Sequence, residues 1–534
     1  MLGGELVFHF INVVVLTALA APIVLWRYRR AVLAGMRATG AAPLPVAAVN
    51  TVARDRARAA AAGAAADAAL AWERRMRRRI FAAVLAALAP PALLLAGQYF
   101  AINRMEATPA HVFIVAAVTC SAAVPIFAVL TATPFWRALA LLIATCCALA
   151  AAGVVVSMAQ RPFYGKLPTL DQTLNFVAFF RLANESLWIP LLLGLAIGAR
   201  RVRGVAPLAF AGLLVFAIAL VLGVRLTQWL AGMRWSAPFV LGGPGLDAGF
   251  VVLALPIGLV AWWRLKSLAR RYRAKRFSEA QLLAHSWWLA LVATAAVQLV
   301  SVHPEASALL PIVVVSTMAY LLFPFLLALA LRRAWHGVAR PPPRTLLVLR
   351  VFGDTRRAEG LFDRIASRWR LFGPVTTIAA PDIAARTVDP GDLLSFASGD
   401  IADTFVRSAA DLQRRMAWLD TAPDPDGRYR IEEFCCRDDT WRATVVELIE
   451  RADAVLMDLR AFTAERHGCE FELGELAARS DPARVVLLVD ASTDLGLLAR
   501  SVPPGSAPMR QFMIDRSHGG QVDAAFTELL RAAA

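Results

Sequence analysis

The pattern of apolar and polar residues divides the chain into two halves. Before residue 341, long apolar stretches alternate with short basic segments. Because about 20 consecutive apolar residues cross a bilayer as a helix, we expect about nine membrane spans. They lie near residues 5–26, 80–101, 109–131, 138–158, 180–199, 205–224, 247–263, 283–301 and 307–331. The fifth stretch contains Arg181 and Glu185 and Pro256 interrupts the seventh, so seven or eight spans remain an alternative.

After Pro341-Pro342-Pro343 the apolar runs shorten to the length of strands. Strand candidates are residues 345–351, 375–380, 429–434, 454–459, 485–490 and 511–515, and helix candidates are 356–370, 392–419, 440–451, 466–479, 493–500 and 521–533. Continuously apolar strands that alternate with helices predict a doubly wound parallel sheet, here of five or six strands. The predicted fold is therefore a polytopic α-helical membrane domain, residues 1–340, followed by an α/β domain, residues 341–534.

Composition supports this division. Hydrophobic residues make up 58% of the 534 residues, charged residues only 18%, and the mean hydropathy is +0.56. In typical soluble proteins about a quarter of the residues are charged. The composition argues against an ordinary soluble enzyme and against a disordered chain, which needs low hydrophobicity.

The net charge of +16 is unevenly distributed. Residues 1–340 contain 32 Lys and Arg against 10 Asp and Glu, whereas residues 341–534 contain 24 against 30. The polar half is acidic, so we expect no nucleic-acid partner. With the N-terminus outside, the predicted inner segments hold 26 cations and the outer ones 6, which places the α/β domain in the cytoplasm, beneath an inner (plasma) membrane.

The segment before the second predicted span is rich in Ala and Arg. Residues 46–79 favour helix by composition, so we expect one long helix that runs into that span. The cluster from Arg74 to Arg79 has two interpretations: a topology signal, or a site for anionic lipids. Membrane lipids are expected partners in both.

Ligands of doubly wound sheets bind at the carboxyl ends of the strands. Three sets of residues are expected there. The first strand is followed by Phe352, Gly353 and Asp354, which are candidate ligand contacts. The fourth predicted strand, residues 454–459, ends near Asp458 and Arg460. The helix after it opens with Cys469 and Glu472.

These segments resemble two known families. The run from ADAVLMDLR through GCEFELGEL to RVVLLVD is similar to Toll/interleukin-1 receptor (TIR) domains, whose helix opens with Trp-Cys-x-x-Glu. Cys469 and Glu472 match the Cys and the Glu, and Gly468 stands in place of the Trp. The same run resembles nucleoside deoxyribosyltransferases, which carry Glu-Leu-Gly, here Glu472-Leu473-Gly474. Both families have flavodoxin-like sheets, and in both the matched Glu acts on an N-glycosidic bond.

The resemblance implies that Glu472 and Asp458 are catalytic, with NAD or a nucleoside as substrate. Cleaving an N-glycosidic bond develops positive charge on the ribose, which a carboxylate stabilises. A position near the helix N-terminus would keep Glu472 ionised at pH 7. The alternatives are that Glu470, Glu472 and Glu475 only complement the helix dipole, and that the domain is a silent interaction module or a ligand sensor. An interaction module would form homo-oligomers.

No metal site is expected, because the six cysteines lack the spacing of zinc ligands and suit a reducing cytoplasm. No bound cofactor is expected either, with NAD entering only as a substrate.

Overall fold

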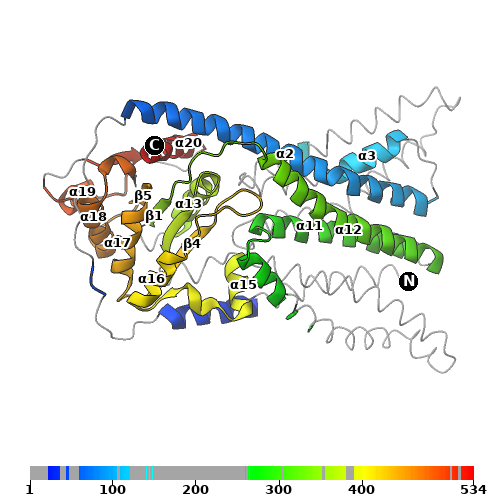
Figure 1. Ribbon diagram of the computed structural model, residues 1–534, viewed down its shortest axis with the longest axis horizontal. Coiled ribbons are helices and arrows are strands. Elements are labelled where there is room, and N and C mark those ends of the chain that lie inside the picture. Colours follow the sequence, from blue (N-terminus) through cyan, green and yellow to red (C-terminus); the bar gives the residue numbers. More distant parts are fainter. Residues whose placement is uncertain are drawn as a thin grey trace. The chain divides into compact units, whose positions relative to one another are not determined.

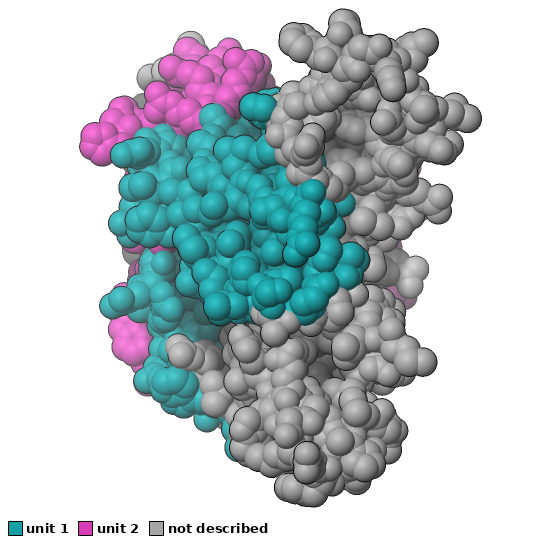
Figure 2. Space-filling model, turned by 90° about the vertical axis from the view of Figure 1, so that its right-hand side faces the viewer, with its two compact units in different colours: residues 1–25, 80–334, 388–398 teal, residues 26–79, 335–387, 399–534 magenta. Residues whose placement is uncertain are grey.

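The structure is a computed structural model. It describes residues 22–36, 44–46, 59–104, 109–120, 140, 143, 144, 147, 259, 262, 263, 265–303, 305–350, 355–379, 390–504, 508–514 and 519–534. These residues belong to two compact units, coloured in Figure 2. One comprises residues 1–25, 80–334 and 388–398, and the other residues 26–79, 335–387 and 399–534. We call the second the α/β unit.

The α/β unit contains one parallel sheet of seven strands, in the order β3-β4-β2-β1-β5-β6-β7. The strands are β1 (Leu346–Arg350), β2 (Val375–Ala379), β3 (Phe405–Val406), β4 (Ile431–Cys436), β5 (Ala454–Asp458), β6 (Val485–Val489) and β7 (Arg510–Met513). Every residue of β1, β2, β5 and β6 is buried, as expected for strands covered on both faces. The predicted parallel sheet is confirmed, with one strand more than expected.

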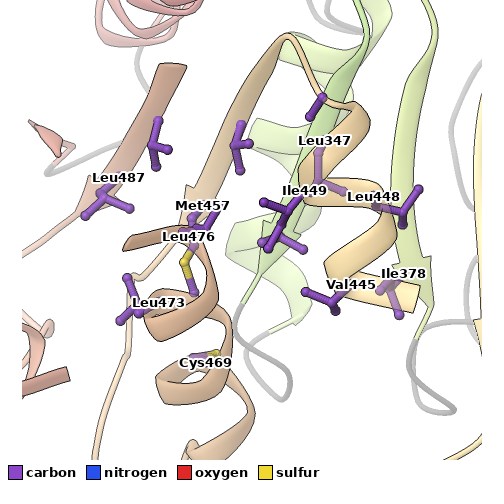
Figure 3. Packing of buried hydrophobic residues seen from close by; sticks show 14 of the residues in the cluster. Leu347, Ile378, Val445, Leu448, Ile449, Met457, Cys469, Leu473, Leu476 and Leu487 are labelled. Carbon is purple, nitrogen blue, oxygen red and sulfur yellow. The ribbon is translucent and has the colours of Figure 1, made fainter. Parts of the chain in front are cut away.

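Helices connect these strands, as Figure 1 shows. They are α13 (Thr355–Trp369), α16 (Ala409–Ala417), α17 (Trp441–Arg451), α18 (His467–Arg479), α19 (Leu495–Ser501) and α20 (Gly519–Ala533). Local chemistry fixes several starts: the Ser408 side chain accepts the N–H of Asp411 at the start of α16, and Asp494 accepts that of Leu497 at α19. The main core cluster lies between the sheet and α17 and α18 and includes Leu347, Met457, Leu473 and Leu487 (Figure 3).

The predicted helix over residues 392–419 is wrong. That segment contains α15 (Pro390–Ser398), a 3-10 helix at Ile401–Thr404, strand β3 and α16. Gly399 has a φ of +89°, a conformation that L side chains rarely adopt and that ends α15. The apolar spacing of this segment resembles one helix only because two short helices follow each other.

Part of the N-terminal half belongs to the α/β unit. Helix α2 (Ala59–Ile102) begins in this unit, and its buried Glu73 accepts two hydrogen bonds from Arg368 of α13, at 2.9 and 2.7 Å. The neighbouring Trp72 packs on Phe372 and donates to the carbonyl of Ala339. The unit therefore has a wider boundary than the predicted domain at residues 341–534.

The prediction of about nine membrane spans is corrected by the structure. In the described residues, two helices have the length and composition to cross a membrane: Ala62–Ile102 within α2, and Ser307–Trp335 within α12 (Ala306–Trp335). They cover the predicted spans at 80–101 and 307–331. The predicted long helix into the second span is confirmed by α2 over the described part.

The predicted span at 283–301 lies in α11 (Glu279–Val302), which is not one of these two helices. Most of its described side chains are buried, and the side chains of Gln281, Ser286 and Thr294 have hydrogen-bond partners within the helix or its cap. A helix packed inside a protein and a membrane span share an apolar composition, so the apolar run at 283–301 does not by itself distinguish the two. Of the span at 109–131, only α3 (Pro109–Cys120) is described. The spans near 5–26, 138–158, 180–199, 205–224 and 247–263 lie almost wholly outside the described residues.

Candidate functional site

Topology selects one edge of the sheet. Strands β1 and β5 are neighbours, but the chain leaves β1 toward β2 on one side and leaves β5 toward β6 on the other. In doubly wound sheets, ligands bind outside the carboxyl ends of strands at such a reversal. The register pairs Arg350 with Asp458, the last residues of the two strands. A basic and an acidic residue therefore stand next to each other at the reversal point.

Asp458 is held by Arg460. Both side chains are largely buried, and the guanidinium donates from Nε to Oδ1 at 2.8 Å and from Nη2 to Oδ2 at 2.6 Å. Such two-point pairs are stronger than single charged hydrogen bonds. Asp458 can accept a hydrogen bond from a ribose hydroxyl only if its ion pair with Arg460 breaks, or if a carboxylate oxygen accepts from both groups at once.

Arg350 is the second buried guanidinium at this edge. Its Nη2 lies 3.9 Å from Oε1 of Glu433 on β4, and its guanidinium carbon lies 5.2 Å from the ring centre of Phe362 on α13. Arg350 was not among the predicted ligand contacts. Its position could have indicated a site residue, because Arg350 is a charged residue at the end of an otherwise apolar strand, LLVLR.

The loops after β5 and β6 are tied together. Ala461 has a φ of +60°, which is costly for a residue with a Cβ, and its N–H donates to Ser492 Oγ at 3.1 Å. Asp490 accepts the N–H of Ser492 at 3.0 Å, and Thr493 Oγ1 donates to the carbonyl of Leu459. Strained backbone of this kind concentrates at binding and catalytic sites.

Glu472 lies in the second turn of α18, on the helix face that packs against the sheet. Its neighbours on that face, Cys469, Leu473 and Leu476, belong to the core (Figure 3). The Glu472 side chain is 1% exposed, and its Oε2 has no hydrogen-bond partner among the described residues. Burial raises the pKa of this carboxyl to about 8.

The expectation that the helix N-terminus keeps Glu472 ionised is therefore wrong. Desolvation outweighs the helix dipole because the side chain points inward in the second turn, whereas the dipole acts within the first. At pH 7 Glu472 is mainly a neutral acid, which can donate a proton.

Cys469 is buried beside Glu472. Burial raises the pKa of its thiol, and the nearby carboxylates of Glu472 and Asp458 raise it further. The thiol stays protonated and is a poor nucleophile. Gly468, where the TIR motif has Trp, lies against Trp441 of α17: a Cβ there would be 3.8 Å from the indole.

The structure brings Asp458, Arg460 and Arg350 together at the edge. Asp458 and Glu472 lie on opposite faces of the sheet. Met457 points into the core beneath α18, so alternation along β5 directs Asp458 toward the opposite face. The predicted contacts Phe352, Gly353 and Asp354 lie outside the described residues. Among the residues that the structure describes, no three His, Cys, Asp or Glu side chains form a metal-binding group.

The chain matches no known family model, curated protein or solved structure. The resemblance to TIR domains and deoxyribosyltransferases therefore stays a prediction that depends on the short motifs around Glu472.

Proposed function

We propose that this chain is a membrane-tethered sensor whose α/β unit binds a small phosphate-bearing ligand of the nucleotide type. The ligand would contact the edge formed by the carboxyl ends of β1 and β5. Tethering is supported by the two helices of membrane length, α2 and α12.

One observation carries the ligand assignment: Arg350 and Asp458 are register partners at the reversal point, with Arg460 bound to Asp458. Guanidinium groups bind phosphate oxygens in two-point geometry, and carboxylates bind ribose hydroxyls. Both kinds of group are present on adjacent strands. Charged groups that are largely buried at a sheet edge are unusual unless they pair or bind a ligand.

A second candidate function is cleavage of an N-glycosidic bond, and it is favoured by Glu472. A neutral carboxyl with a pKa of about 8 suits a general acid. It would donate its proton to the leaving base while water adds to the ribose carbon, so the products are the free base and the sugar. This role fits a nucleoside, whose base must be protonated to leave, better than it fits NAD, whose cationic nicotinamide ring leaves as a neutral base without a proton.

Binding is tested by the melting temperature of the full chain in detergent, with NAD, ADP-ribose and deoxyadenosine as probes. A ligand at one hundred times its Kd stabilises by about 2.7 kcal/mol. The double variant Asp458→Asn/Arg460→Gln removes both charges and should abolish the shift. The matched control is Glu447→Gln/Arg451→Gln, which removes an ion pair of 3.5 Å on α17.

Cleavage is tested separately by product formation from the same probes. Glu472→Gln should lower the rate by about a hundredfold or more, as expected for a lost general acid. A chain that binds a probe without cleaving it supports the sensor alone. If no probe shifts the melting temperature, or if both double variants lose the shift equally, the proposed site is wrong.

A further inference from the structure

A basic helical segment in the other compact unit carries a second inference. Helical residues 265–273 and the turn that follows contain six cations, Lys266, Arg270, Arg271, Arg273, Lys275 and Arg276. No acidic residue occurs between residues 248 and 278 of the sequence. In the predicted topology this segment is one of the inner segments that hold 26 cations.

The apolar face of this segment is buried within its own unit. Leu265, Ala269 and Tyr272 form a core cluster with Leu394 and Ala397 of α15. The packing is close: a Cβ on Gly391 of α15 would lie 2.7 Å from the Tyr272 hydroxyl oxygen. The same hydroxyl donates to Glu279 at 3.0 Å. This packing fixes the rotation of the helix, so its cationic face points outward.

The outward face combines unpaired cations with aromatic rings. Lys266, Arg270, Arg271 and Arg276 are exposed, and none forms a salt bridge within the described residues. Trp262 and Trp263, 51% and 58% exposed, lie directly before them. The Lys266 Nζ is 5.9 Å from the centre of the Trp262 ring. Along the chain, exposed apolar Leu259 comes first, then the tryptophans, then the cations.

We propose that this face, defined by Trp262, Trp263, Lys266, Arg270, Arg271 and Arg276, binds the headgroups of anionic phospholipids. Tryptophan concentrates at the boundary between lipid and water, and clustered Lys and Arg beside it attract anionic headgroups. A soluble polyanion would need the cations but not two exposed indoles. The order of apolar, aromatic and basic residues matches the order of layers at a membrane surface.

The test uses the full chain purified in detergent, with phosphatidylglycerol and phosphatidylcholine added in equal amounts. Native mass spectrometry measures the ratio of the two bound lipids. Arg270→Gln/Arg271→Gln/Arg276→Gln should lower the preference for phosphatidylglycerol by about tenfold or more. Replacing the same three residues by Lys should keep it. The control is Arg442→Gln/Arg451→Gln/Arg500→Gln, three exposed cations of the α/β unit, which should not change the ratio.

A photoactivatable phosphatidylglycerol locates the site in the unaltered chain, so the test does not depend on a variant that folds. Adducts on residues 259–276 are the expected result. Three results would overturn the proposal: adducts only elsewhere, an unchanged lipid ratio in the Gln variant, or loss of the preference when excess pyrophosphate is added. The last would indicate a site for a soluble phosphate compound.

Discussion

At the scale of single residues, Glu472 makes the stability of the α/β unit depend on pH. Burial raises the pKa of this carboxyl from 4.5 to about 8, so the folded state binds its proton more tightly than the unfolded state. The stability that this protonation contributes is fully present below about pH 4.5 and is lost as the pH rises through 8.

We therefore expect the free energy of unfolding to fall between about pH 5 and pH 8, with a limiting slope near 1.4 kcal/mol per pH unit. Urea unfolding at several pH values measures this slope. Glu472→Gln should remove most of it, because the amide does not titrate. A slope that is the same in the wild type and in Glu472→Gln would contradict the account.

The control for this experiment is Glu470→Gln, since Glu470 is partly exposed and lies 3.6 Å from exposed His467. Glu475, one turn further along, is unsuitable. It accepts a hydrogen bond from buried Arg479, which also donates to Glu450, so its loss would disturb a network. The sequence places both acids on one helix but does not show which of them is paired.

At the scale of elements, the loop from Asp424 to Arg428 forms a socket for Trp335 at the end of α12. The indole donates to the Asp426 carbonyl at 2.8 Å, and Gly427 has a φ of +81°. A Cβ on Gly427 would lie 1.9 Å from the indole. Only glycine permits both the turn and the close approach.

Gly427→Ala should therefore destabilise the unit by more than 2 kcal/mol, roughly the sum of backbone strain and a steric clash. Gly399→Ala is the matched control. Its φ is +89°, but a Cβ there meets nothing within 4 Å, so about 1 to 2 kcal/mol of strain alone is expected. Thermal melting compares the two, and equal losses would show that the socket does not constrain Trp335.

The ion pair between α2 and α13 gives a second prediction at this scale. Glu73 is 2% exposed and binds Arg368 at two points, whereas Asp523 binds the same guanidinium but is 71% exposed. Glu73→Gln should cost about 3 kcal/mol, because it leaves a partly buried cation with one weak partner. Asp523→Asn should cost less than about 1 kcal/mol. The reverse order of the two losses, measured by urea unfolding, would contradict this account.

The strands that could be predicted from the sequence are those marked by a short, continuous apolar run. Strands such as AVLMD and VVLLV are short apolar runs between helices, and their predicted ends agree with β5 and β6 to within one residue. Strand β3 could not be predicted, because two residues carry no periodicity. It exists only because Phe405 and Val406 pair with Cys435 and Cys436 of β4.

At the scale of the molecule, the sequence indicated a domain boundary at Pro341 but not the contacts that residues before this boundary make within the α/β unit. Trp72 and Glu73 lie more than 250 residues before the partners they contact, and no local pattern reveals such a pair. The edge site was partly predictable, since Asp458 and Arg460 lie at the carboxyl end of a predicted strand. The burial of Glu472 was not, because its helix start resembles an exposed, charged one.

The unit boundary gives a testable consequence for fragments. A fragment of residues 335–534 retains Trp335 and should melt at a higher temperature than residues 341–534. A peptide of residues 59–79, added in trans, should stabilise the longer fragment further by contributing Trp72 and Glu73. The same peptide with Glu73→Gln should be weaker. Equal melting temperatures for both fragments, with no effect of the peptide, would mean that the wider boundary is wrong.

The edge at β1 and β5 is the proposed ligand site of the α/β unit. Hydrogen exchange of the full chain in detergent, with and without the nucleotide probe that binds most tightly, tests it most directly. We expect slower exchange of the backbone N–H groups at residues 459–462 and 491–494, and no such change in Asp458→Asn/Arg460→Gln. Protection confined to other segments, or equal protection in the double variant, would contradict the claim.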